Sequence, residues 1–210
     1  MEPDKLISSI NNHFRNFEDC SFRVIRSDSF CYVIDGQYPA INRFPNESKE
    51  VNVIKWFRDF WLFLEIEFKH SEQKVKIVTK TRTKLQTTTH ISLSVFQGDD
   101  TDNKKNQLFR AEWDDYNKPD EVHAQPHWQI TSNQAIENLL DDYADVYEEP
   151  EILKEFKKEK LKVIDVKKIH FAMNGDWQNN KTHVHNLVDE QQVVKWLQGL
   201  LNHIRIELGS

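Results

Sequence analysis

The sequence predicts an α+β fold in which an antiparallel β-meander of about five to seven strands is flanked by an N-terminal helix and a long C-terminal helix. Two observations predict this fold. Apolar residues recur at helical spacing near both ends of the chain, and they alternate with polar residues through its middle. Because no repeat, low-complexity tract or Gly/Ser linker divides the 210 residues, we expect a single α+β domain over residues 1–210.

Composition narrows the class of protein. The aromatic share of 11% is too high for a disordered chain, and the net charge of −6 excludes a globally basic nucleic-acid binder. Cys20 and Cys31 form no CxxC motif and are interpreted as buried thiols of a reducing compartment. The N-terminus lacks the pattern of a secretory signal, and the longest apolar run, residues 60–64, is too short to cross a bilayer. We therefore expect a cytosolic (cytoplasmic) protein with no membrane contact.

The N-terminal part is expected to hold two helices and a hairpin. Apolar residues three or four apart predict an amphipathic helix over residues 4–18. Residues 22–34 are predicted to form a hairpin that turns at Ser27-Asp28. Val51, Ile54, Phe57 and Trp61 follow helical spacing, which predicts a second helix that runs directly into a strand.

From residue 62 onward the apolar period changes from helical to two, as is typical of strands with one buried face. The predicted strands lie around residues 62–68, 75–79, 91–95, 109–113 and 128–130. The predicted turns lie at residues 70–73, 84–88, 98–106 and 118–126. The alternation predicts a meander with one apolar and one polar face.

After the meander, the pattern predicts two helices over residues 136–147 and 151–161, and a strand over 169–173. The chain then closes with a predicted helix from residue 189 to 208, which is apolar at positions three and four apart. This long terminal helix is expected to pack across the sheet.

The register of the sheet is predicted by pairing apolar residues with one another, because a slip of one residue turns every side chain to the opposite face. The predicted pairs are Phe68–Val75, Ile66–Ile77, Ile77–Val95, Val95–Phe109, Ile91–Trp113 and Trp113–Trp128.

The same register gathers polar residues on the other face. Asp114 is predicted to lie opposite both His90 and His127, Glu112 between Ser92 and Gln129, and Arg110 between Ser94 and Thr131. Cross-strand neighbours have Cβ atoms about 5 Å apart, so these side chains would form one patch. His170 would join it if its strand docks alongside.

Two kinds of chemistry fit this patch. His127, Asp114 and Glu112 are side chains of the types that bind zinc, manganese or iron, so they would hold a divalent metal as cofactor. Alternatively, Asp114 fixes the tautomer of His127, which acts as a general base while Arg110 stabilises an anionic intermediate; His90 completes this catalytic set. The simpler interpretation is a solvated sheet face, where polar alternation is required in any case.

Two neighbouring features are candidates for binding. His123 lies four residues before His127, but Pro126 disfavours the helix that a helical metalloprotease motif needs, so His123 is assigned to a loop. Lysine and arginine residues at positions 74, 76, 80, 82 and 84 are predicted to line one face of one strand. Glu67 is expected to pair with Lys76, which leaves Lys80, Arg82 and Lys84 for nucleic-acid phosphates.

No nucleotide-binding or serine-hydrolase motif occurs in the sequence. The leading functional hypothesis is a bacterial-type accessory or binding subunit that recognises a macromolecular partner, foremost a protein, through the polar sheet face. The alternative is a metal- or histidine-dependent hydrolase, such as a nuclease-like toxin or a defence effector, that uses the His/Asp/Glu/Arg patch.

Overall fold

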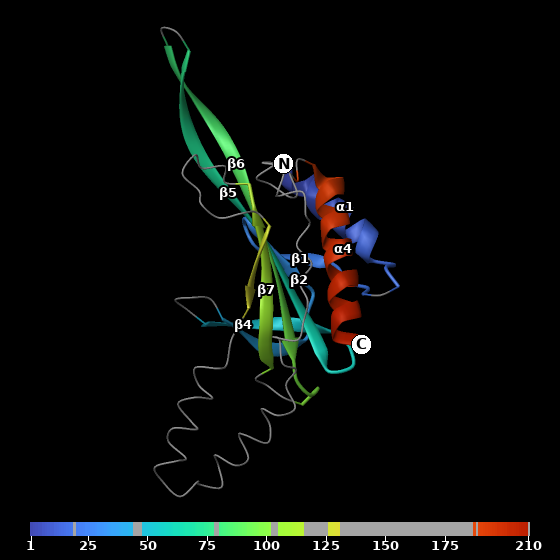
Figure 1. The fold of residues 1–210 in the computed structure, drawn as a ribbon. Helices are drawn as coiled ribbons and strands as arrows, with labels where there is room; N and C mark the ends of the chain where they lie inside the picture. Colours follow the sequence, from blue (N-terminus) through green and yellow to red (C-terminus); the bar gives the residue numbers. More distant parts are fainter. Residues whose placement is uncertain are drawn as a thin grey trace, which may run out of the picture.

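The computed structural model describes residues 1–18, 20–43, 48–77, 80–101, 105–115, 126–130, 187 and 189–209, with the backbone alone at 72–77, 80–85, 129 and 130. Within these ranges the chain forms two helices and an antiparallel sheet of eight strands, which confirms the α+β class and both flanking helices (Figure 1). The elements are α1 Pro3–Phe14, β1 Val24–Asp28, β2 Cys31–Ile34, β3 Tyr38–Arg43, β4 Ser48–Phe57, β5 Phe60–Ile77, β6 Lys80–Gln97, β7 Asn106–Asp114, β8 His127–Ile130 and α4 Glu190–Gly209.

The strands are ordered β1-β2-β5-β6-β7-β8 in the sheet, and β3 joins through β4. β5 divides one of its edges between two partners. Residues 65–67 of β5 pair with β2, and residues 60–62 pair with β4. The other edge of β5 pairs with β6 along its whole length, so β5 and β6 form the central pair of the molecule.

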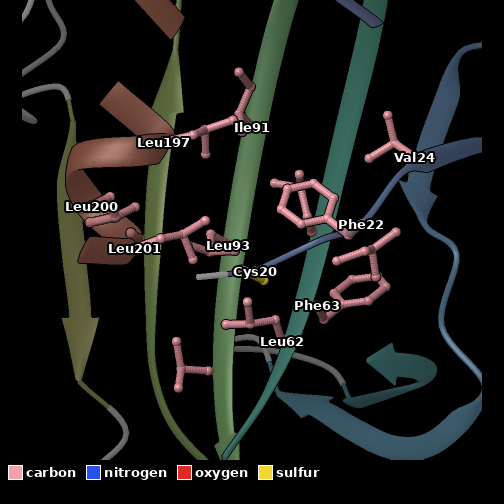
Figure 2. Close-up of a cluster of buried hydrophobic side chains, with 14 of the residues drawn as sticks. Cys20, Phe22, Val24, Leu62, Phe63, Ile91, Leu93, Leu197, Leu200 and Leu201 are labelled. Atoms are coloured by element: carbon pink, nitrogen blue, oxygen red, sulfur yellow. The ribbon is translucent and has the colours of Figure 1, made fainter. Parts of the chain in front are cut away.

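One face of β5–β7 is apolar and is covered by the helices. Its rows of paired residues are at most 3% exposed: Ile66, Ile91 and Trp113; Leu64, Leu93 and Ala111; Leu62, Val95 and Phe109. Figure 2 shows Leu197 and Leu201 of α4 lying against Ile91 and Leu93 of β6. Since burying one such side chain stabilises a fold by about 1.5–3 kcal/mol, this face forms the main core.

The N-terminal helix is fixed to the sheet by a side-chain amide as well as by apolar packing. α1 buries Leu6, Ile7, Ile10 and Phe14. Asn11 then binds the backbone of Val24 twice, since its Nδ2 donates to the carbonyl at 3.0 Å and its Oδ1 accepts from the N–H at 2.7 Å. These bonds satisfy backbone groups at the start of β1 and set the position of α1 beside it.

The opposite face of β5–β7, called the polar face below, is partly covered by β3 and β4. The β3–β4 pair crosses this face (Figure 1), and β3 bonds directly to β7 through the Arg43 N–H, which donates to Gln107 Oε1 at 2.7 Å. The return of the chain into β3 depends on Gly36, because a Cβ there would lie 2.3 Å from the carbonyl oxygen of Asn52. A side chain at position 36 would therefore displace β4.

The predicted helix over residues 51–61 is wrong. Those residues form most of β4, a turn with Arg58 at a positive φ of 49°, and the start of β5. The helical spacing was coincidental, because Val51 and Val53 also alternate, and both are buried in the strand. β-branched residues favour strands, and pairing with β3 and β5 satisfies the backbone of β4.

The predicted turns at residues 70–73 and 84–88 are also wrong. β5 and β6 each run unbroken for 18 residues, and their pairing extends as far as Ile77–Lys80. The predicted pairs Phe68–Val75, Ile66–Ile77 and Ile77–Val95 therefore do not form; Phe68 pairs with Thr89 and Ile66 with Ile91. Position 76 pairs with Thr81 rather than with Glu67.

The other predicted helices and strands are either confirmed or lie outside the described residues. α1, the β1–β2 hairpin, the 98–106 connection, β8 and α4 are confirmed to within a few residues. The predicted helices over 136–147 and 151–161 and the strand over 169–173 lie outside the described residues. Cys20 is buried and Cys31 is half-buried, and the described residues show no disulfide at either. Among the described helices, none is long and apolar enough to span a bilayer.

Candidate functional site

The β6–β7 register places polar residues opposite one another as the sequence predicted. Glu112 lies opposite Ser92, and Asp114 lies opposite His90. The pairs Val95–Phe109 and Ile91–Trp113 also form, so the alternation of apolar residues was a sound guide to this hairpin. The polar face therefore begins with the expected neighbours.

The β7–β8 register differs from the prediction by two residues. His127 lies opposite Glu112 rather than Asp114, and Trp128 lies opposite Ala111 rather than Trp113. Opposite the small Ala111, the Trp128 ring packs at the edge of Phe109, with 5.5 Å between ring centroids. Pairing of the two tryptophans was expected from matched hydrophobicity, but Trp128 contacts Phe109 instead, its diagonal neighbour on the same face.

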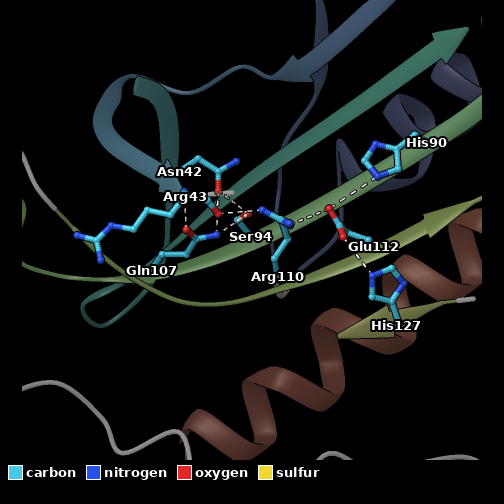
Figure 3. Close-up of polar contacts among 8 residues, drawn as sticks. All are labelled: Asn42, Arg43, His90, Ser94, Gln107, Arg110, Glu112 and His127. Carbon is cyan, nitrogen blue, oxygen red and sulfur yellow. Dashed lines mark hydrogen bonds and ion pairs between the residues drawn. The ribbon is translucent and has the colours of Figure 1, made fainter. Parts of the chain in front are cut away.

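Glu112 is the centre of a cluster of ionisable side chains, called here the Glu112 cluster: Arg110, Glu112, His90 and His127 (Figure 3). Arg110 Nε lies 2.8 Å and His90 Nε2 3.8 Å from Glu112 Oε1, and His127 Nε2 lies 3.2 Å from Oε2. The cluster spans β6, β7 and β8, so it forms only when all three strands pair.

The environment of Glu112 keeps its carboxylate ionised. Burial by itself raises the pKa of Glu112, but the hydrogen bond from His127 and the charges of Arg110, His90 and His127 outweigh it. The net pKa lies below the ordinary value of 4.5. An ionised, buried carboxylate can orient an imidazole or stabilise a cation.

Arg110 is held from its other side by β3. Its Nη1 donates to the carbonyl of Arg43 at 2.8 Å, and its side chain is only 4% exposed. Next to it, Asn42 Oδ1 accepts hydrogen bonds from Ser94 Oγ and Gln107 Nε2, both at 2.9 Å (Figure 3). This buried network fixes the guanidinium against Glu112.

The interpretation of this region as a solvated sheet face is wrong. Ser92, Ser94, Arg110 and Glu112 are all at most 7% exposed. The two imidazoles lie nearer the surface, with 21% of the His90 side chain and 28% of the His127 side chain exposed. The Glu112 cluster is thus buried at its carboxylate, and its two imidazole rings are partly exposed.

A second group on the polar face was missed by the sequence analysis. The metal-ligating atoms of Cys31, Glu65 and Glu67 lie within 4.8 Å of one another. Burial, above all, raises the pKa of the Cys31 thiol, and the charges of Glu65 and Glu67 add to the effect. The sequence analysis assigned no partner strand to residues 31–34, so it did not place Cys31 beside Glu67.

The other site residues predicted from the sequence are Asp114, Gln129, His123 and His170. Asp114 is half-buried opposite His90, away from the His127 position that the metal hypothesis required. For Gln129 only the backbone is described, and it lies opposite Arg110. His123 and His170 lie outside the described residues.

The basic positions lie on a projecting two-stranded arm, called here the β5–β6 arm (residues 69–77 and 80–88). Pairing with β2 ends at Glu67 and pairing with β7 ends at His90, so within the described residues the arm strands pair only with each other. Figure 1 shows the arm extending away from α1 and α4.

The register of the arm separates its basic positions onto two faces. Lys80, Arg82 and Lys84 are paired with residues 77, 75 and 73, which continue the polar face. Lys74 and Lys76 occupy positions that continue the apolar, helix-side face. The predicted single stripe on one strand is therefore wrong.

Comparison with known proteins does not assign this chain to a family. No protein-family model matches this chain, and no curated protein or solved structure matches it significantly.

Proposed function

We propose that this protein is a nucleic-acid-binding protein that uses the β5–β6 arm as its contact surface. The charge of the arm carries the proposal. Residues 69–88 contain six basic residues and one acidic residue, while the whole chain has a net charge of −6. The basic residues are Lys69, Lys74, Lys76, Lys80, Arg82 and Lys84.

The dimensions of the arm support a nucleic-acid partner. A two-stranded β-ribbon fits the major groove of B-DNA, which is about 12 Å wide. Nine residue pairs extend to roughly 30 Å at about 3.4 Å per residue. Lys80, Arg82 and Lys84 occupy every second position of one strand, which spaces them roughly 7 Å apart along a phosphate backbone.

Charge and stability considerations support the same partner. Because the arm is basic and the rest of the chain is acidic, a polyanion would be attracted to the arm and repelled by the body. A two-stranded ribbon by itself is only marginally stable in water. Contact with a phosphate backbone would supply stabilisation that no further strand provides among the described residues.

Fluorescence anisotropy with a labelled DNA duplex tests the proposal. Lys80→Gln/Arg82→Gln removes two charges from the polar-face side of the arm, and Lys74→Gln/Lys76→Gln removes two from the other side as a matched control. The first variant should reduce the slope of log affinity against log salt by about 1–2, because each phosphate contact contributes about 0.9. The control should change it less.

Two results would contradict the proposal. Wild-type protein that fails to bind duplex or single-stranded nucleic acid at low salt would leave an acidic protein as the partner of the arm. Equal binding by wild type and by both variants would place the contact outside the arm.

The Glu112 cluster favours a second candidate function, a histidine-dependent hydrolase. Here Glu112 takes the orienting role that the sequence analysis assigned to Asp114, since its carboxylate contacts the Nε2 atoms of both histidines. Loss of phosphodiesterase or other hydrolytic activity in His127→Asn, with folding unchanged, would support this candidate. Equal activity in wild type and His127→Asn would reject it.

A further inference from the structure

The group formed by Cys31, Glu65 and Glu67 lies on two paired strands, β2 and β5. Cys31 is directly opposite Glu67, and Val33 is opposite Glu65, so all three potential ligands share the polar face. The Cys31 thiol lies 3.7 Å from Glu65 Oε1, and the three ligand atoms are within 4.8 Å of one another. The strand pairing, rather than a flexible loop, sets this geometry.

Burial makes this group different from a surface cluster of acids. The Glu65 side chain is 6% exposed, and Lys49 Nζ lies 3.3 Å from its Oε1. The Lys49 side chain itself is 55% exposed, so the ammonium can move into solvent. Glu65 therefore keeps a buried negative charge whose counter-ion is exchangeable.

Ser92 is a second, independent feature at the same place. On β6 it lies between Glu65 of β5 and Glu112 of β7, and it is completely buried. Its hydroxyl has no hydrogen-bond partner among the described residues. Since a buried hydroxyl without a partner costs free energy, a polar ligand beside Glu65 would satisfy it.

We propose that Cys31, Glu65 and Glu67 bind a divalent transition metal of the zinc type. Thiolate sulfur favours zinc over magnesium or calcium, and carboxylates complete zinc sites. A tetrahedral zinc site places sulfur and oxygen ligands about 3.6 Å apart, close to the separation of Cys31 Sγ and Glu65 Oε1. Glu67, with 36% of its side chain exposed, can rotate to close the remaining gap.

The binding step has a defined balance of charge. The metal takes the place of the Lys49 ammonium at Glu65, and the Cys31 thiol releases one proton to solvent as its sulfur bonds to the metal. Three protein ligands leave one tetrahedral position for water. The site adjoins the base of the β5–β6 arm, because Lys69 Nζ lies 3.6 Å from Glu67 Oε2.

Titration with Co²⁺ as a spectroscopic probe tests the site in the 210-residue chain. We expect one Co²⁺ per chain, a thiolate-to-cobalt charge-transfer band, and release of about one proton per metal. Cys31→Ser should abolish the band and weaken binding at least tenfold. Cys20→Ser, which changes a buried cysteine outside the group, is the matched control and should keep the band. Circular dichroism confirms that each variant is folded.

Lys49→Gln should change the Co²⁺ affinity in the opposite direction from Cys31→Ser. Removal of the competing ammonium should tighten Co²⁺ binding severalfold, an effect that a merely structural role for Lys49 does not produce. The proposal is overturned if the band survives in Cys31→Ser, if wild type binds no stoichiometric Co²⁺, or if Lys49→Gln weakens binding.

Discussion

The two faces of the β5–β7 sheet are both buried, but different interactions hold each one. On the helix side, apolar rows pack under α1 and α4. On the other side, Arg110 pairs with Glu112 and bonds to the Arg43 carbonyl of β3, and Gln107 bonds to Asn42 of β3. The buried rings of Trp61, Phe63 and Phe96 lie on the same face. Apolar packing depends on volume, whereas a buried polar network depends on every partner being present, so the two faces should respond differently to single substitutions.

Trp113→Ala should give the largest loss of stability and tests the packing of the apolar face. Trp113 is 3% exposed in the row with Ile66 and Ile91. Removing the indole leaves a cavity, so the free energy of unfolding should fall by about 3–5 kcal/mol. Chemical denaturation measures the loss, and Trp113→Phe should lose less. A variant that unfolds like wild type would place Trp113 outside the core.

Glu112→Gln tests how much the polar network stabilises the fold. The free energy of unfolding should fall by about 3 kcal/mol at neutral pH. The amide keeps the shape but leaves the buried Arg110 guanidinium without its carboxylate. The folded-state pKa of Glu112 is lowered, so its contribution is present above the unfolded pKa and is lost as pH falls through the lower folded value. Denaturation curves of wild type and variant should therefore converge below pH 4.5, and a gap that stays constant would contradict the ion pair.

Asp114→Asn should give the smallest effect, within about 0.5 kcal/mol, because Asp114 is half-buried on the polar face and the substitution is nearly isosteric. It also separates the two possible β7–β8 registers. With His127 paired to Glu112, the NMR signals of the His127 ring should stay unchanged in Asp114→Asn and move in Glu112→Gln. The reverse result would restore the register in which Asp114 contacts His127.

The fold was predictable where one signal decided the structure. Alternation of apolar residues in β6 and β7 set their register, and the helical spacing in α1 and α4 had no competing interpretation. The residues after Lys69 also carried a usable signal, since no Gly, Pro, Asn or Asp occurs in residues 70–73. A tight turn there was therefore disfavoured, and recognition of that fact would have extended β5.

The sequence by itself determined which side chains share a face of each strand, because that depends on a local period of two. Only the tertiary structure decided that the polar face is buried, because β3 and β4 return over it from an earlier part of the chain. Contacts across β7 and β8 likewise depended on how Trp128 packs near Phe109. The partners of Glu112 and of Cys31 were therefore set by long-range packing, which no local pattern encodes.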